Sequence, residues 1–468
     1  MGTTHESAVY TQEMGRFALI IVALGSGCSS WQPPGDGIAK GCHETAVSDQ
    51  TLRQRTGISS HLEWADDAAS TARREFEIAQ WAELGIGLAR TDFSWDLVEP
   101  ERGVWDWSGP DRVMDAAESV NVQVLPILNY GNPWASSLGD DRHLPPDDLG
   151  DFGTYAAALA ERYGGRLQRY EIWNEPNTGG TFWEPTDDPA LYADLMVVAA
   201  DALHEADPDG LVSSAGLFGP KLLVNMPAPE FTAEMMAERP DALNHVDAFG
   251  FHPYRYPFTS PETEDAVQES SVTSICGFET QLADAGHDLP LWNTEMGWHT
   301  APDALVAGIT PEQHAAFTIR SMVLNYAQGV QMYTIYTFRD SGDDLGDQEQ
   351  NFGLYTWDAD PLSGDDAEMK PAAAALKAFL QLAGDATEVS DRSVALGLDG
   401  NTYAYNLVGA SSRTVVLWTD GDPVTVALGQ TRGASVLDLF GQPIDVEVRR
   451  GAWQLPVSGD PIYVSIAY

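Results

Sequence analysis

The chain has 468 residues, which is more than one small hydrophobic core needs and allows a large domain with a smaller second one. Its 70 acidic and 25 basic residues give a formal net charge of −45, spread along the chain rather than gathered in a tail. Such a charge disfavours binding to nucleic acid and electrostatic attachment to anionic lipid.

The N-terminus has the features of an export signal. Residues 17–27, FALIIVALGSG, are apolar or small and lead to Cys28; they are too few to span a bilayer but match the apolar core of a signal peptide. If translation starts at Met14, the segment resembles a bacterial lipoprotein signal with lipid on Cys28, although Gly25 replaces the usual larger aliphatic residue. An ordinary cleaved signal or a plain buried start are the alternatives. We expect a signal peptide over 1–28 and an exported protein, either secreted or anchored to the cell envelope only through this lipid.

The following segment, 29–54, is rich in Gly, Pro and polar residues and is predicted to be a linker. The three cysteines of the chain, Cys28, Cys42 and Cys276, have no metal-binding spacing. If Cys28 carries lipid, a disulfide between the other two is possible but not required.

From residue 55 to 383, short apolar runs alternate with amphipathic stretches. The runs with strand character are GISSHL, GIGLART, VQVLPILNY, LQRYEIWNE, LVSSAGLFG, VDAFGFHPY, LPLWNTE and VQMYTIYTF. Helical patterns cover 67–84, 110–120, 152–163, 189–206, 311–327 and 371–382. Strands separated by helices pair in parallel, so this segment is predicted to be an α/β domain, a (β/α)8 TIM barrel with a packed apolar interior.

Residues 384–468 lose the helical period. Short alternating runs replace it, each closed by Gly, Asp or Pro: NTYAYNLVG, RTVVLWT, PVTVALG, ASVLDLFG, DVEVRR and PIYVSIAY. This pattern predicts a small antiparallel β-sandwich domain. It has no ligand-binding motif that we can assign, so it is either a structural appendage of the barrel or an independent carbohydrate-binding module.

Two glutamates end apolar runs of the predicted barrel. Glu175 closes the fourth run in EIWNEPN, and Glu295 closes the seventh in LPLWNTE. Site residues of such barrels lie at the carboxyl ends of the strands, and strands four and seven face each other across the mouth. Cleavage of a glycosidic bond needs one acid and one carboxylate, about 5–5.5 Å apart in a retaining enzyme. The alternative is that Glu175 only caps the segment that follows it.

Several ordered elements together resemble glycoside hydrolase clan A, the retaining (β/α)8-barrel β-glycosidases, most closely families 39 and 5. They are Asn-Glu-Pro in the fourth run, Thr-Glu-Met-Gly-Trp in the seventh, Arg90 in the second and the stretch RTDFSWDLVEPERGVWDW. The resemblance covers about residues 55–383, and nearly the whole mature chain with the β domain added. It implies that Glu175 is the general acid/base, that Glu295 is the nucleophile, that Asn174 holds the sugar 2-hydroxyl and that no cofactor is needed.

Electrostatic arguments support the same roles. An acid that is protonated near neutral pH needs a raised pKa, which a second carboxylate and apolar walls from Trp173 and Trp134 would give Glu175. Glu295 must stay ionised, and Arg90 would supply the opposite charge that favours its ionised form.

Two supporting residues have structural alternatives. Arg90 could instead form an ion pair with Glu63 or Asp92. His252 and Tyr254, in HPY at the end of the sixth run, resemble the strand-six residues that line the site in clan A, although His252 could be a core histidine whose hydrogen bonds are satisfied.

A sugar ring has polar edges and apolar faces, so its binding sites combine hydroxyl-reading groups with aromatic platforms. Asn129 is a candidate for reading hydroxyls, and Trp134, Trp298 and Tyr336 are candidate platforms, each equally compatible with a place in the core. The acidic chain disfavours polyanionic substrates, so we expect neutral oligo- or polysaccharides derived from xylan, glucan or mannan.

Three alternative functions stay open. The first is a non-catalytic carbohydrate-binding lipoprotein on the same barrel, against which the presence of both glutamates argues. The second is a metal-dependent hydrolase; His252, His299 and His314 have no tight ligand spacing and no H-E-x-x-H occurs, so no metal site is predicted. The third is a transglycosylase, which differs only in whether water or a sugar reaches the covalent intermediate first.

Overall fold

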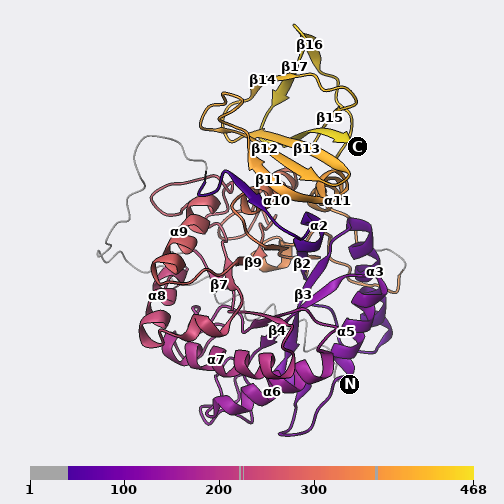
Figure 1. Cartoon of the computed structure of the whole chain (residues 1–468). Coiled ribbons are helices and arrows are strands. Elements are labelled where there is room, and N and C mark those ends of the chain that lie inside the picture. The colour runs from indigo at the N-terminus through magenta and orange to yellow at the C-terminus, as the bar shows by residue number, and fades with distance from the viewer. Residues whose placement is uncertain (1–40, 221–222, 225, 364–366) are drawn as a thin grey trace.

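A curled parallel sheet ringed by helices forms most of the molecule (Figure 1). The computed structural model describes residues 41–220, 223–224, 226–363 and 367–468. The predicted signal peptide over 1–28 and the predicted lipidation site Cys28 lie outside these residues. Among the described helices, none is long and apolar enough to cross a membrane.

The parallel sheet closes into a barrel. Its strands in chain order are β2 (Thr56–Ser59), β3 (Leu88–Ser94), β4 (Gln123–Asn129), β5 (Arg169–Ile172), β6 (Leu211–Ser213), β7 (Leu217–Phe218), β8 (Phe249–His252), β9 (Leu291–Met296) and β10 (Met332–Ile335). They are ordered β6-β5-β4-β3-β2-β10-β9-β8-β7, so the two edges, β6 and β7, are halves of one interrupted strand. A parallel bridge between Ser213 and Ala248 joins β6 to the start of β8. The sheet therefore has eight strand positions, and the predicted TIM barrel is confirmed.

Helices connect the strands on the outside of the barrel (Figure 1). They are α3 (Ala68–Leu84), α4 (Trp95–Val98), α5 (Ser108–Ser119), α6 (Leu149–Tyr163), α7 (Pro189–Ala206), α8 (Ala228–Glu238), α9 (Ser271–Asp284), α10 (Pro311–Ala327) and α11 (Pro371–Ala383), with 3-10 turns η2 (Ala242–His245) and η3 (Gln348–Asn351). All six predicted helices are confirmed to within three residues at each end, whereas α4, α8 and α9 were not predicted. In α9 the β-branched Val272, Thr273 and Ile275 and the following Gly277 lower the intrinsic helix propensity, which hides the helix in the sequence.

The C-terminal domain is the predicted antiparallel β-sandwich. One sheet has the order β1 (Thr45–Val47), β11 (Ala386–Asp391), β12 (Thr402–Gly409), β13 (Ser412–Thr419), β18 (Ile462–Ala467) and β15 (Ser435–Leu437). The other has the order β14 (Val424–Gly429), β17 (Ala452–Val457) and β16 (Glu447–Arg449). Buried residues of both sheets, such as Leu417 and Leu455, pack in one apolar cluster between them.

The opposite face of the larger sheet packs on the barrel beside α10 and α11 (Figure 1). Trp418 of β13 belongs to the same buried cluster as the barrel core, and its indole donates to Glu262 Oε1 at 2.7 Å. Arg320 of α10 forms a buried ion pair with Glu262 and a second ion pair with Asp420, which is exposed. The sandwich is therefore fixed to the barrel by apolar and ionic contacts.

The prediction of a linker through residue 54 is wrong for residues 45–54. Strand β1 pairs with β11, with Thr45 opposite Ser390, and a short helix, α2 (Leu52–Arg55), follows. The sequence hides β1 because two of its three residues are exposed, so backbone pairing rather than an apolar pattern holds it in place.

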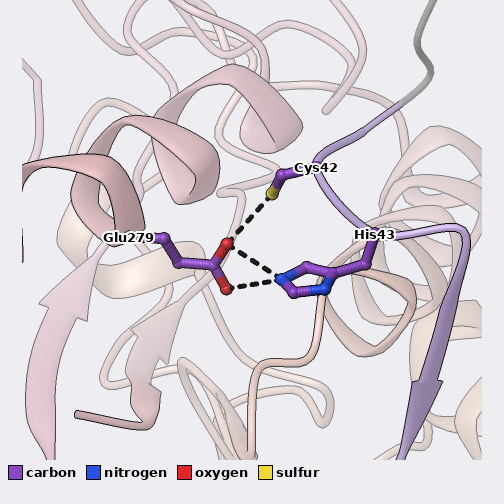
Figure 2. A group of neighbouring side chains, drawn as sticks. All are labelled: Cys42, His43 and Glu279. Carbon is purple, nitrogen blue, oxygen red and sulfur yellow. Dashed lines mark hydrogen bonds and ion pairs between the residues drawn. The ribbon is translucent and has the colours of Figure 1, made fainter. Parts of the chain in front are cut away.

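A covalent link fastens the same segment to α9. Cys42 and Cys276 form a disulfide with a Cα–Cα distance of 5.7 Å. Beside it, the imidazole of His43 lies 3.0 Å from the carboxylate of Glu279 (Figure 2). Glu279 Oε2 also approaches Cys42 Sγ to 3.1 Å, which is a contact rather than a hydrogen bond because a disulfide sulfur carries no proton. The start of the described chain is thus tied to the barrel as well as to the sandwich.

Candidate active site

Glu175 and Glu295 meet at the carboxyl ends of their strands, across the mouth of the barrel. Glu175 follows β5 by three residues, and Glu295 lies near the end of β9. One carboxylate oxygen of each and a ring nitrogen of His252 all lie within 4.8 Å of one another. This spacing agrees with that of retaining glycosidases, about 5–5.5 Å, and is shorter than the 6.5–9.5 Å or so of inverting ones.

The turn after β5 directs Glu175 into the site. Trp173 and Glu175 have φ values of 70° and 46°, in the left-handed region that costs a non-glycine residue about 1–3 kcal/mol. Hydrogen bonds offset this cost: the Trp173 indole donates to Phe182 O at 2.8 Å, and Glu175 N donates to Gly216 O at 3.2 Å. The carboxylate of Glu175 contacts His252, so it does not cap the following segment; the Thr178 hydroxyl makes the local contact instead, to Glu175 O.

Arg90 of β3 holds the nucleophile candidate. Its Nη1 donates to Glu295 Oε2 at 2.6 Å, while Nε and Nη2 donate to the two oxygens of Glu171 at 2.6 and 3.2 Å. Nη2 also donates to Asn174 Oδ1 at 2.9 Å, and the Asn174 amide in turn reaches the Tyr130 hydroxyl at 3.2 Å. Arg90 is 2% exposed, so its charge acts on these carboxylates without much screening by solvent.

The alternative partners proposed for Arg90 are engaged elsewhere. Glu63 forms ion pairs with Arg73 and Arg339, and Asp92 pairs with His61. The prediction that Arg90 supports Glu295 is therefore confirmed as a contact.

Burial and charge separate the two glutamates. Burial raises the pKa of Glu175 well above its usual range, and the nearby Glu295 raises it further. Burial also raises the pKa of Glu295, but Arg90 and the Tyr254 hydroxyl, which donates to Glu295 Oε1 at 2.7 Å, lower it. Both oxygens of Glu295 thus accept hydrogen bonds that favour the ionised form, so Glu295 ionises first and Glu175 keeps its proton.

His252 links Glu175 to the Arg90 network. Its Nδ1 lies 2.7 Å from Glu175 Oε1 and its Nε2 lies 3.0 Å from Thr294 Oγ1. The Thr294 hydroxyl donates its one proton to Glu171 Oε1 at 2.7 Å, which pairs with Arg90. Burial lowers the pKa of His252 well below its usual range, so the ring is neutral and carries one N–H.

This series of hydrogen bonds assigns the proton positions. Because the Thr294 oxygen can only accept from His252, the ring proton lies on Nε2 and Nδ1 is an acceptor. The group that donates to Nδ1 is then a protonated Glu175. His252 is therefore a buried residue of the site and not merely a core histidine.

Tyr254 and Tyr336, both predicted site residues, line an open cleft of about 440 Å³ above the two glutamates. The rest of its lining comes from the loops after the fifth, sixth and eighth strands: Phe218, Pro220, Leu223, Arg255, Tyr256, Phe258, Gln348, Glu349 and Phe352. We call this hollow the catalytic cleft. Aromatic rings beside carboxylates give it the mixed character of a sugar-binding site.

Three predicted residues lie elsewhere. Trp298 is fully buried, with its indole donating to Thr259 O, so its prediction as a platform is wrong because no ring face is exposed. Trp134 packs 5.2 Å from Trp95 (ring centroids) and lies outside the cleft lining, so the predicted wall beside Glu175 is wrong. Asn129 is fully buried and donates to Asp92 Oδ1 at 2.5 Å, so it positions that carboxylate and does not face the cleft.

The sequence analysis missed Glu171 and Glu349. Glu171 is the first residue of EIWNEPN, and its signal was a charge placed two residues before Trp173 inside an apolar strand, where side chains alternate between faces. Glu349, in η3, lines the catalytic cleft, and burial raises its pKa to about 8. Its Oε1 accepts from Gln348 at 3.0 Å.

Two described groups bring potential metal ligands together: Glu175 with His252 and Glu295, and Cys42 with His43 and Glu279. In the first, the ligand atoms already serve one another, Tyr254 and Arg90, and in the second the sulfur is in the disulfide. The donor sets thus fit proton transfer and cross-linking better than metal binding, and independence from a cofactor stays a prediction.

Comparison with known proteins places the fold. A family model described as β-galactosidase, of glycoside hydrolase family 42, matches residues 64–128. A family 39 glycoside hydrolase from the gut symbiont Bacteroides cellulosilyticus superposes with a TM-score of 0.68 at 20% identity, over 90% of this chain and 83% of that chain. A family 39 β-xylosidase from Caulobacter crescentus gives 0.62 at 18%, over 90% and 97%. A family 51 α-L-arabinofuranosidase from Bifidobacterium longum gives 0.60 at 13%, over 91% and 98%.

These structures share the barrel and the added β domain across nearly the whole described chain. The matched segment 64–128 includes Arg90 and the strand on which it lies. Together, the partial family match and the shared fold support the resemblance to glycoside hydrolases of clan A.

Proposed function

We propose that the protein is a retaining glycoside hydrolase that cleaves β-glycosidic bonds, with Glu175 as acid/base and Glu295 as nucleophile. The observation that carries the proposal is the pair of carboxylates within 4.8 Å, one held ionised by Arg90 and Tyr254 and the other protonated against His252. Two carboxyl groups with opposite protonation at this spacing are what double displacement requires.

In the first step, Glu295 attacks the anomeric carbon from the face opposite the leaving group. The bond to the leaving oxygen breaks, its electron pair goes to that oxygen, and Glu175 transfers its proton there, so the leaving sugar departs as an alcohol. The rest of the substrate stays as an ester on Glu295. Neutral His252 accepts no net proton in this step, because its pKa is lowered by burial.

In the second step, Glu175 is an ionised base. It removes a proton from a water molecule, whose oxygen attacks the anomeric carbon while the ester bond breaks and its electrons return to Glu295. Two inversions give overall retention. Asn174, held by Arg90 and Tyr130, is placed to hold the 2-hydroxyl of the sugar.

We also propose that the substrate is a neutral oligo- or polysaccharide. Ionised Glu295 lines the catalytic cleft and the whole chain has a formal net charge of −45, so a polyanionic substrate would be repelled. The disulfide between Cys42 and Cys276 supports export, because such links persist in oxidising compartments.

The test is hydrolysis of a panel of aryl β-glycosides and neutral polysaccharides by the wild type and by Glu175→Ala and Glu295→Ala. Loss of the acid/base should lower kcat by about 10²–10⁴-fold for poor leaving groups. Azide should rescue Glu295→Ala and give a glycosyl azide of inverted configuration. Exposed Glu312→Ala serves as the matched control.

Wild-type rates of Glu175→Ala on poor leaving groups, or of Glu295→Ala without azide, would refute the assignment. A wild type that binds oligosaccharides without cleaving them would favour the binding-protein alternative. Products longer than the substrate would favour a transglycosylase, since a sugar would then replace water in the second step.

A further inference from the structure

Glu171 is a buried carboxylate of the site to which the proposed mechanism gives no role. It lies in β5, is fully buried and is not part of the lining of the catalytic cleft. Its hydrogen-bond partners include Arg90 of β3 and Thr294 of β9. Neither strand is a hydrogen-bonded neighbour of β5 in the sheet, so the side chain of Glu171 points into the barrel interior.

The carboxylate of Glu171 accepts four hydrogen bonds from the described residues. Arg90 Nε donates to Oε2 at 2.6 Å, and Arg90 Nη2 donates to Oε1 at 3.2 Å. The Thr294 hydroxyl and the Gly216 amide donate to Oε1 at 2.7 and 3.0 Å. An ionised carboxylate has about four acceptor positions, so this buried charge is fully hydrogen-bonded and its orientation is fixed.

Gly216 permits this arrangement because it has no side chain. It lies in the break between β6 and β7, where its N–H donates to Glu171 and its C=O accepts from Glu175 N at 3.2 Å. A Cβ at this position would clash with His252 Nε2 and Thr294 Oγ1. The interruption of the fifth barrel strand therefore brings a backbone donor to Glu171.

One series of contacts leads from Glu171 to the proposed nucleophile. Glu171 accepts from two nitrogens of the Arg90 guanidinium, and the third nitrogen, Nη1, donates to Glu295 Oε2 at 2.6 Å. Because a guanidinium is planar and rigid, fixing two of its nitrogens also fixes the direction of the third. Glu171 shares the charge of Arg90 as well, so this charge does not act on Glu295 alone.

A second series leads from Glu171 to the proposed acid/base. Because Glu171 accepts the Thr294 proton, the Thr294 oxygen is left to accept from His252 Nε2. The other ring nitrogen, Nδ1, is then the acceptor for the proton of Glu175. Without an acceptor at residue 171, the Thr294 hydroxyl would be free to donate to His252, which would reverse the direction of these hydrogen bonds.

We propose that Glu171 is the positioning residue of the site: it aims the guanidinium at the nucleophile and sets the direction of the hydrogen bonds that end at the acid/base. The inference rests on the proposed glycosidase function, which assigns the roles of the two glutamates. Because it is fully buried outside the cleft lining, Glu171 touches no substrate. It acts on the reaction through its charge and its hydrogen bonds.

The groups around Glu171 determine what the loss of its charge would do. The titratable and charged side chains that face it are Arg90 of β3, Glu175 after β5, Tyr192 of α7, His252 of β8 and Glu295 of β9. Burial raises the pKa of Tyr192 and lowers that of His252, so both are uncharged. Burial is the main cause of the raised pKa of each glutamate, and the charge of Glu171 raises both further. Removing that charge should lower both pKa values.

The test is the pH dependence of kcat/KM for Glu171→Gln, which keeps the shape of the side chain and removes its charge. The acid limb reports the ionisation of Glu295, and the alkaline limb reports the loss of the Glu175 proton. Both limbs should move to lower pH by about one unit. At the optimum, kcat should fall by about tenfold to 100-fold, because the guanidinium loses its acceptor at Nε.

Two further variants separate charge from packing. Glu171→Asp keeps the charge but shortens the side chain, so it should lower kcat by about tenfold and leave both limbs in place. Asp207→Asn is the matched control, because Asp207 is also buried and accepts from Tyr170, the neighbour of Glu171 in β5 on the opposite face of the strand. It should retain the wild-type kcat and both limbs. Limbs that stay in place in Glu171→Gln, or that move equally in Glu171→Asp, would overturn the proposal.

Two outcomes call for a different measurement. If Glu171→Gln does not fold, Glu171→Asp carries the test, and a wild-type kcat in that variant would overturn the proposal. If the wild type cleaves no glycoside, the proposed function fails, and the positioning role is tested by ¹³C NMR of side-chain-labelled glutamates. Glu175→Gln and Glu295→Gln identify the two signals. Both pKa values should be lower by about one unit in Glu171→Gln, and unchanged values would overturn the role.

Discussion

Replacing Thr294 by Val should move the pH dependence of the reaction to lower pH. In the wild type, the Thr294 oxygen accepts from His252 Nε2 and so keeps the ring proton away from Glu175. With Val, an Nε2–H would be buried without a partner, at a cost of about 1–3 kcal/mol. The ring proton then moves to Nδ1, where it donates to Glu175 Oε1 and favours the ionised acid/base.

The size of the effect follows from this cost. One pKa unit corresponds to about 1.36 kcal/mol, so the pKa of Glu175 should fall by about 1–2 units. Activity needs Glu175 protonated, and the alkaline limb of kcat/KM against pH should therefore move to lower pH by that amount. The assay is hydrolysis of an aryl glycoside with a poor leaving group between pH 4 and 9.

Two controls sharpen the result. Thr294→Ser keeps the hydroxyl and should retain the wild-type profile. A dinitrophenyl glycoside, whose leaving group needs no proton, should lose little rate with Thr294→Val. An alkaline limb that stays in place or moves to higher pH would refute the assignment of the ring proton to His252 Nε2.

Three further perturbations follow from the described contacts. Tyr254→Phe removes the donor to Glu295 Oε1, so the pKa of Glu295 rises; since Glu295 must be ionised, the acid limb should move to higher pH by about one unit. Burial lowers the pKa of His314 to about 3, so below about pH 6.5 the unfolded chain binds more protons than the folded one. The free energy of unfolding should therefore decrease as the pH is lowered, by about 3 kcal/mol from pH 7 to pH 4. His314→Leu, which breaks no described hydrogen bond, should remove this loss in urea unfolding. Replacing Cys42 and Cys276 by Ser should lower the free energy of unfolding by about 2–4 kcal/mol.

Each of these has a contrary outcome. An unchanged acid limb in Tyr254→Phe would mean that the tyrosine does not stabilise the ionised nucleophile. If the wild type and His314→Leu lost the same free energy of unfolding between pH 7 and pH 4, groups other than His314 would be responsible for the loss. If the cysteine variants, the reduced wild type and the oxidised wild type all had the same free energy of unfolding, the disulfide would contribute nothing to stability.

The barrel could be predicted because the same pattern, an apolar run followed by turn residues, repeats along the chain. Eight apolar runs, each followed by turn residues and mostly by a helical period, leave few alternative topologies. The same repetition located Glu175 and Glu295, since both end a run and the carboxyl ends of barrel strands converge. Strand β1 (Thr45–Val47) escaped prediction because its residues are largely exposed and its partner lies more than 300 residues away.

Side-chain direction in the loops was the part that the sequence could not provide. Trp298 follows a strand end as Tyr336 does, yet Trp298 turns into the core and Tyr336 lines the cleft. Glu349 lies in the polar stretch GDQEQ, where nothing along the chain indicates burial, and only the fold of η3 brings it to the site. Thr294 was visible next to Glu295, but its role depends on His252 from another strand.

The central claim, double displacement through Glu295, is tested most directly by trapping the covalent intermediate. The wild type is incubated with a 2-deoxy-2-fluoro glycoside that carries a dinitrophenyl leaving group and the sugar identified by the aryl panel, then digested and mapped by mass spectrometry. The account predicts one equivalent of fluorosugar as an ester on Glu295, and no label in Glu295→Ala. A label on another residue, or turnover of the parent substrate with inversion and no trapped ester, would contradict it.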